Sequence, residues 1–135
     1  MSSRTLRSMV LVAGAAFVAV SAALGGGSSG AYTFKTYCAT CHGSAGKGDG
    51  QIASMLTVKP SDLTRIAARN GGKFATDEVR KRIDGRDFVP PHGTSDMPIW
   101  GDAFSQSEQA GGQEAAKARV DELVEYLRTI QVADK

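Results

Sequence analysis

The sequence predicts an all-α fold made of a few short helices and long loops. No segment of useful length alternates apolar and polar residues in the way that a β-strand does. Glycine and proline instead interrupt much of the chain, and the one long periodic segment lies close to the C-terminus. Because short helices joined by long loops give too little regular structure to close a core, we expect another group to fill the centre of the molecule.

The start of the chain differs from the rest in charge and composition. Arg4 and Arg7 are followed by an uncharged, mostly apolar run over residues 9–24, and small residues come after it. This order is typical of a secretory signal peptide, which we place over residues 1–23. A retained membrane anchor is the alternative, although the run is shorter than the roughly 20 residues that span a bilayer.

Residues 24–30 are rich in glycine and serine and predict a flexible linker. The working domain, over residues 31–135, would then lie outside the cytoplasm. The whole chain has a formal charge of +2, with 16 Lys+Arg and 14 Asp+Glu, and both cations in excess lie in the first thirty residues. Because the domain is formally neutral, we do not expect a nucleic-acid partner held by a basic surface.

In the first half of the domain, short predicted helices alternate with loops. A helix is expected over residues 31–40, followed by a glycine-rich loop over residues 43–50. Residues 51–56 predict another short helical segment. Ser61 or Asp62 can cap a further turn.

The second half contains two clearer helices. Thr76, followed by acidic residues, predicts the N-cap of a helix that ends at Gly85. Three prolines predict a loop over residues 87–104, with an exposed linker over residues 105–112. A final helix is expected over residues 113–130, because apolar residues recur along one face at helical spacing: Val120, Leu123, Val124, Leu127 and Ile130.

The strongest chemical signal is the pentapeptide CATCH, with Cys38, Cys41 and His42. This C-x-x-C-H pattern is typical of covalent attachment of a c-type haem. Two thiols on one helical turn can each form a thioether with a haem vinyl group, and the adjacent histidine is brought to the iron as an axial ligand. A thioredoxin-like redox pair would need a βαβ setting, and a zinc site would need four ligands. A disulfide between the two cysteines would close too short a loop to stabilise much.

The other axial position of the iron needs a second ligand, for which Met97 is the preferred candidate. Pro98 favours an extended backbone at Met97, which helps the loop to hold this side chain inward. The chain from His42 to Met97 is long enough to reach the far face of the ring. His92, an open position and Met55 are the alternatives, although Met55 lies in an apolar segment where core packing is its ordinary role.

These motifs resemble those of the class I, single-haem cytochromes c of bacterial periplasms. The resemblance extends over the chain after Ala31 and is strongest in YCATCHG and MPIWG, at residues 37–43 and 97–101. It implies a cytochrome c fold, in which short helices and long loops surround one covalently bound haem and the first and last helices cross. Ligation of the iron by one histidine and one methionine is a recurring arrangement in such proteins.

The resemblance implies roles for two further residues. A proline carbonyl after the haem motif accepts a hydrogen bond from the histidine Nδ1 in this family, and Pro60 stands at the matching position. Such a bond would orient His42 and strengthen it as a donor to iron. Trp100 resembles the aromatic residue that lines the haem, with core packing as the alternative. Several basic residues could pair with the haem carboxylates: Lys59, Arg65, Arg69 and Arg86.

An iron with both axial positions filled leaves no vacancy for oxygen or peroxide, so the expected function is electron transfer and not catalysis. The haem would cycle between Fe(III) and Fe(II) in the periplasm. Its partners would be redox proteins, namely a donor dehydrogenase or membrane complex and an acceptor oxidase or reductase. The alternatives are a haem-bearing electron-acceptor subunit of a periplasmic dehydrogenase or oxidase complex and, less favoured, a haem peroxidase or sensor. A membrane partner is expected only if residues 1–23 are retained.

Overall fold

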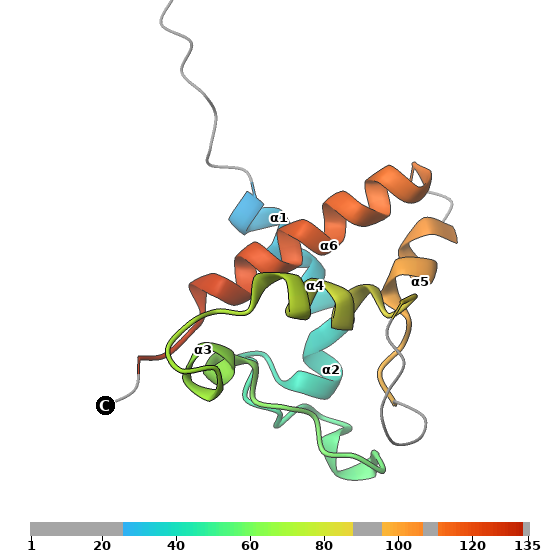
Figure 1. Cartoon of the computed structure of the whole chain (residues 1–135). Coiled ribbons are helices and arrows are strands. Elements are labelled where there is room, and N and C mark those ends of the chain that lie inside the picture. The colour runs from blue at the N-terminus through green and yellow to red at the C-terminus, as the bar shows by residue number, and fades with distance from the viewer. Residues whose placement is uncertain (1–25, 88–95, 107–110, 134–135) are drawn as a thin grey trace, which may run out of the picture.

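The computed structural model describes residues 26–87, 96–106 and 111–133 (Figure 1). All regular structure in these ranges is helical, which confirms the predicted all-α class. None of the described helices combines the length and the apolar composition that a membrane span requires. The predicted signal peptide and His92 lie outside the described residues.

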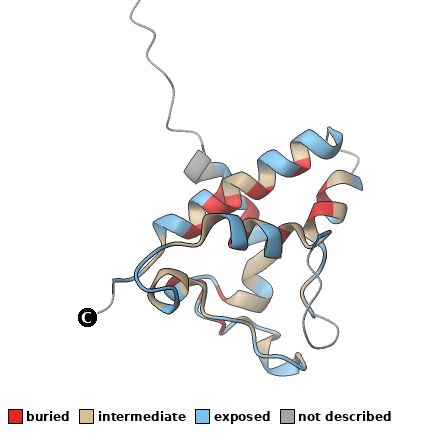
Figure 2. Cartoon of the chain, viewed as in Figure 1, coloured by how far each residue is buried: buried red, intermediate tan, exposed pale blue. Residues whose placement is uncertain are grey.

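The core is built along α6 (Gly112–Thr129), which confirms the predicted final helix to within one residue at each end. α6 packs against α1 (Gly26–Thr33) and α5 (Trp100–Gln106). Figure 2 shows buried residues following one face of α6. Four residues of the predicted apolar stripe are buried together with one alanine: Ala116, Val120, Leu123, Val124 and Leu127. Ile130, the fifth residue of that stripe, follows the helix and is half-buried.

The first helix begins earlier than predicted. α1 continues directly into a π-helical turn, η1 (Phe34–Cys38), and then into α2 (Ala39–His42). The prediction of a flexible linker over residues 24–30 is therefore wrong for residues 26–30, which belong to α1. The reason is tertiary packing, because Gly30 lies so close to α6 that a Cβ there would collide with the backbone of Glu122. Such packing stabilises helices whose own propensity is low.

α5 forms where the sequence predicts the end of a loop and the start of a linker. The predictions over residues 87–104 and 105–112 are wrong for the residues of this helix. Pro98 precedes the first helical residue, and a proline breaks a helix only from within it. Phe104 is 2% exposed and stacks on Trp100 with 5.3 Å between the ring centroids. This aromatic packing stabilises a helix in a segment where the nearby prolines predict a loop.

The segment after α2 consists mostly of loops with short helical turns. The turns are η2 (Ala53–Met55), η3 (Leu63–Arg65) and α3 (Ile66–Arg69). η2 lies inside the helical segment predicted over residues 51–56. Asp62 caps η3, because its carboxylate accepts a hydrogen bond from the Thr64 N–H at 2.9 Å. One of the two predicted caps is thus confirmed.

α4 (Thr76–Asp84) confirms the helix that the sequence predicts to end at Gly85. It ends at Gly85, which has a φ of 74° and so adopts the left-handed conformation that glycine favours. The N-cap is Ala75, one residue before the predicted Thr76, and its side chain makes no capping bond. In Figure 1, α4 lies between α6 and the loops that follow α2.

Candidate functional site

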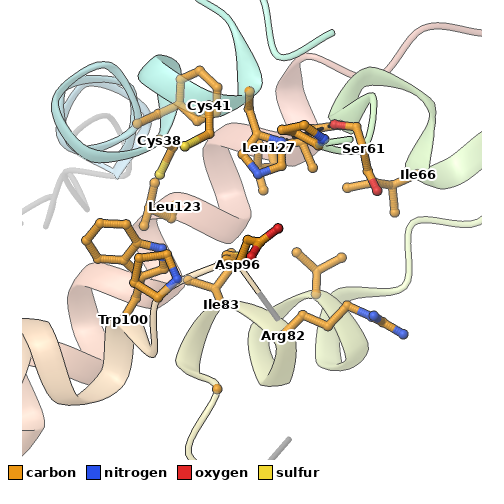
Figure 3. A pocket seen from close by; sticks show the side chains of 18 of the residues that line it. Cys38, Cys41, Ser61, Ile66, Arg82, Ile83, Asp96, Trp100, Leu123 and Leu127 are labelled. Carbon is orange, nitrogen blue, oxygen red and sulfur yellow. Dashed lines mark hydrogen bonds between the residues drawn. The ribbon is translucent and has the colours of Figure 1, made fainter. Parts of the chain in front are cut away.

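A cavity of about 850 Å³ lies in the middle of the molecule, between α6, α4 and the loops after α2 (Figure 3). Cofactor pockets have volumes of about 300–1,000 Å³. Apolar side chains from several elements make up most of the wall: Leu56, Leu63, Ile66, Val79, Ile83, Leu123 and Leu127. A wall of this extent and composition suits a large, apolar cofactor, which agrees with the expectation from the sequence.

The structure brings both cysteines to this cavity. In Figure 3, Cys38 and Cys41 lie on one wall and Ile83 lies on the opposite one. Both thiols are free and half-buried. Burial, with a smaller contribution from the nearby Cys41, raises the pKa of the Cys38 thiol to about 12, so this thiol is protonated at neutral pH. Two sulfur atoms on one wall are what two thioether links to a single ring require.

The helix is widened where it carries the first cysteine. The N–H of Ala39 donates to the carbonyl of Phe34, five residues earlier, instead of four. Wide turns of this kind within helices often lie at functional sites. Phe34 lines the cavity as well as the core, so the turn joins the cysteine wall to the packing against α6.

His42 is oriented by a single backbone hydrogen bond. Its Nδ1 lies 3.1 Å from the carbonyl oxygen of Ser61. Because a carbonyl only accepts, Nδ1 carries the proton and Nε2 keeps its lone pair, which is the form that binds iron. Burial lowers the pKa of His42, and the bond to Ser61 opposes this shift to a smaller extent. The imidazole is therefore neutral at neutral pH.

The predicted partner of this histidine is wrong by one residue. The sequence predicts the carbonyl of Pro60, whereas the structure uses the carbonyl of Ser61. The Pro60 carbonyl oxygen instead lies against Gly48, so closely that a Cβ on that glycine would collide with it. With the Pro60 carbonyl turned to the glycine loop, the next carbonyl reaches the imidazole. Pro60 itself still lines the cavity.

Met97 lines the same cavity as His42. It is half-buried and packs against the core. Met97 lies in the short segment that precedes α5. Met55 is 80% exposed, so it does not pack in the core as the sequence predicts. It is also not among the residues that line the cavity, which gives no support to a role as iron ligand. Of the methionine candidates, the structure places only Met97 at the cavity.

Trp100 also lines the cavity, and it belongs to a cluster of three aromatic rings. Its ring centroid lies 5.7 Å from that of Tyr37, and the Tyr37 centroid lies 5.4 Å from that of Phe104. The cavity-lining role and the packing role that the sequence leaves as alternatives are thus combined in one residue.

Five of the described residues that line the cavity carry charged side chains: Lys59, Arg69, Glu78, Arg82 and Asp96. Lys59 and Arg69 line the cavity, as expected for partners of a carboxylate, whereas Arg65 and Arg86 are not among the lining residues. Arg82 lines it too, although the sequence does not single it out. Its spacing of three from Val79 on one helix face could have indicated this position. No sequence pattern indicates Ser61 or Asp96, which also line the cavity.

The residues at this cavity fit a covalently attached haem. Two free thiols would hold the ring, and a neutral imidazole and a thioether sulfur are the donors that cytochrome iron takes. Cys38 and Cys41 would supply the first pair, and His42 and Met97 the second. The apolar wall would surround the ring.

The family model described as Cytochrome c matches residues 28–131, which includes every element described above except the first two residues of α1. No curated protein and no solved structure gave a significant match to the chain.

Proposed function

Because this chain belongs to the cytochrome c family, whose members carry covalently bound haem c, we propose that it is a periplasmic electron-transfer protein with His42 and Met97 as the axial ligands of its iron. The haem supplies reversible one-electron chemistry between Fe(III) and Fe(II). The protein supplies the ligands, the apolar surroundings and the surface that meets redox partners.

One observation carries this proposal. His42 and Met97 are far apart in the sequence and belong to different segments, yet both side chains line one cavity with the two cysteines. An imidazole and a thioether as the two ligands would leave no position for oxygen or peroxide. A methionine ligand also raises the reduction potential relative to a second histidine.

The surrounding residues would support electron transfer in two ways. The Ser61 carbonyl fixes the imidazole ring and increases its basicity as a ligand, so that little rearrangement accompanies a change of charge. The apolar wall disfavours the additional positive charge of the oxidised site. Both effects favour rapid and reversible cycling over catalysis.

Substitution of Met97 tests the proposal directly. The oxidised protein should show the weak absorption band at the red end of the visible spectrum that marks a methionine bound to Fe(III). Met97→Ala should abolish this band and lower the reduction potential. Met55→Ala is the matched control, since that methionine is 80% exposed, and it should change neither. An unchanged spectrum and potential in Met97→Ala would contradict the proposal, and a high-spin spectrum in the unsubstituted protein would favour a peroxidase or sensor.

The proposed location in the periplasm rests on residues 1–23, with their basic start and apolar run. Mass spectrometry of the mature protein would identify its N-terminus and the added mass of a covalent haem together. Cleavage near residue 23 supports a free periplasmic protein. An intact N-terminus would favour a protein anchored in the inner membrane.

A second candidate function is that of a haem-bearing subunit in a periplasmic dehydrogenase or oxidase complex. Two residues of the cavity wall favour it, because Val58 and Ile99 are 64% and 48% exposed. Exposed apolar surface that gathers at one site marks contacts with other proteins. Purification from the native membrane and periplasm distinguishes the two functions: a carrier elutes at the size of one chain, whereas a subunit elutes with a larger catalytic polypeptide.

A further inference from the structure

The turn that ends α4 supports the segment that carries Met97. A Cβ on Gly85 would lie 3.2 Å from the Cα of Ile99, so the turn and this segment are in direct backbone contact. A Cβ on Gly101 would lie within 2.7 Å of the Arg86 guanidinium and the Asp84 carboxylate. Gly85 and Gly101 thus allow the turn and the segment to pack closely. The contacts on the segment are at Ile99 and Gly101, two and four residues after Met97.

An ion pair gives this turn a fixed shape. Arg86 donates from Nε to Asp84 Oδ1 at 2.7 Å and from Nη2 to Oδ2 at 2.6 Å, which is a bidentate arrangement. Its Nη1 also donates to the side chain of Gln113 in the first turn of α6. The side chains of Arg86 and Asp84 are only 31% and 22% exposed. Those of the Arg82–Glu78 pair on α4 are 58% and 53% exposed.

We propose that Asp84 and Arg86 are positioning residues for Met97, which rests on the proposed function of Met97 as an iron ligand. The ion pair holds the turn rigid, and the turn holds the backbone that follows Met97. Neither residue lines the cavity, so the effect on the ligand passes through Gly85 and Gly101. Bidentate pairing is required because only a guanidinium can bind both carboxylate oxygens in a fixed plane.

Binding of imidazole to the oxidised, haem-loaded protein measures how readily Met97 leaves the iron. Arg86→Ala should increase the affinity for imidazole about five- to tenfold, in line with the loss of a bidentate, partly buried pair. Arg86→Lys keeps the charge but not the bidentate geometry and should give an intermediate increase. Gly101→Ala keeps both charged residues, forces the contact apart and should also raise the affinity.

Arg80→Ala is the matched control. Arg80 pairs with Asp121 of α6 at 2.6 Å and with Asp77 at 2.6 Å, and its side chain is 36% exposed, close to the value for Arg86. This variant removes the same charge and a comparable contact between α4 and α6, but it does not touch the Met97 segment. It should lower the thermal unfolding temperature without changing the affinity for imidazole.

The results separate this inference from the function on which it rests. If the methionine band is present and Arg86→Ala and Arg86→Lys bind imidazole no more tightly than Arg80→Ala, the positioning role is wrong and the ligand assignment stands. If the band is absent from the unsubstituted protein, the ligand assignment fails and the positioning role fails with it.

Discussion

Two regions of this molecule are stabilised in different ways. The helical region, formed by α1, η1, α5 and α6, contains most of the fully buried apolar side chains, among them Phe34, Phe104 and Val124. None of the fully buried apolar side chains lies in the loop region over residues 43–69, all of which the structure describes. The loop region is held instead by backbone hydrogen bonds, such as Leu63 N–H to Gly46 O at 2.6 Å. Packing therefore fixes the cysteine wall, and hydrogen bonds fix the partner of His42.

Blocking haem attachment should have the largest effect on this comparison. In the double variant Cys38→Ala/Cys41→Ala, the apolar walls of both regions lose the group that they surround. The apolar wall of a cavity of about 850 Å³ is then exposed to water, and a domain is stabilised by only about 5–15 kcal/mol. We expect the cooperative thermal unfolding transition, measured by circular dichroism, to disappear. Any helical structure that remains should be that of α1 and α6. Unchanged cooperative unfolding would contradict the central position of the cofactor.

The next largest effect is expected in the helical region. Phe34 is 2% exposed and contacts Tyr126 of α6 with 5.2 Å between ring centroids, so Phe34→Ala should lower the free energy of unfolding by about 3–5 kcal/mol. Tyr32→Ala is the control on the same helical segment, because Tyr32 is 71% exposed and should contribute less than about 0.5 kcal/mol. Guanidinium denaturation of the haem-loaded proteins measures both values. Equal losses would show that the helix crossing is not packed as described.

A smaller effect is expected where the two regions are joined. Gln131 donates from Nε2 to the carbonyls of Leu63, at 2.8 Å, and Leu127, at 2.7 Å, and its Oε1 accepts from the Ala67 N–H at 2.9 Å. Gln131→Ala should therefore lower the free energy of unfolding by about 1–3 kcal/mol. The exposed Gln51 offers a control, and Gln51→Ala should stay within about 0.5 kcal/mol. If both variants unfold alike, Gln131 does not link the regions.

The smallest expected effect is the pH dependence that Asp62 gives to the loop region. Hydrogen bonds from Thr64 lower the pKa of this carboxyl below its usual value of 3.8. Its contribution to stability is therefore fully present above about pH 4 and is lost as the pH falls through the lower, folded-state pKa. Asp62→Asn should be less stable than the unsubstituted protein at pH 7, and the difference should shrink toward pH 3. A difference that stays constant over this range would show that the carboxylate charge is unimportant there.

The helices with strong periodicity were predictable, and those that depend on tertiary contacts were not. The spacing of Val120, Leu123, Val124 and Leu127 places α6 within one residue, because burial of one face dictates that pattern. The start of α1 and the whole of α5 escape prediction. Glycine and proline disfavour helix there locally, and close packing on α6 or stacking on Trp100 outweighs them.

The same distinction applies to the candidate site. The spacing of Cys38, Cys41 and His42 is local chemistry, so the sequence predicts those residues as one group. The carbonyl that holds His42 depends instead on how the Gly48 loop packs against Pro60, and no local pattern separates Pro60 from Ser61. The contact between the Asp84–Arg86 pair and Gly101 likewise exists only because the fold brings two distant segments together.

X-ray absorption at the iron edge tests the central claim most directly, because it identifies the atoms bound to the metal. The account predicts a sulfur scatterer beside the nitrogen shell in the oxidised protein, present in Met55→Ala and lost in Met97→Ala. A shell of nitrogen alone in the unsubstituted protein would contradict the assignment of His42 and Met97 to the two faces of one haem.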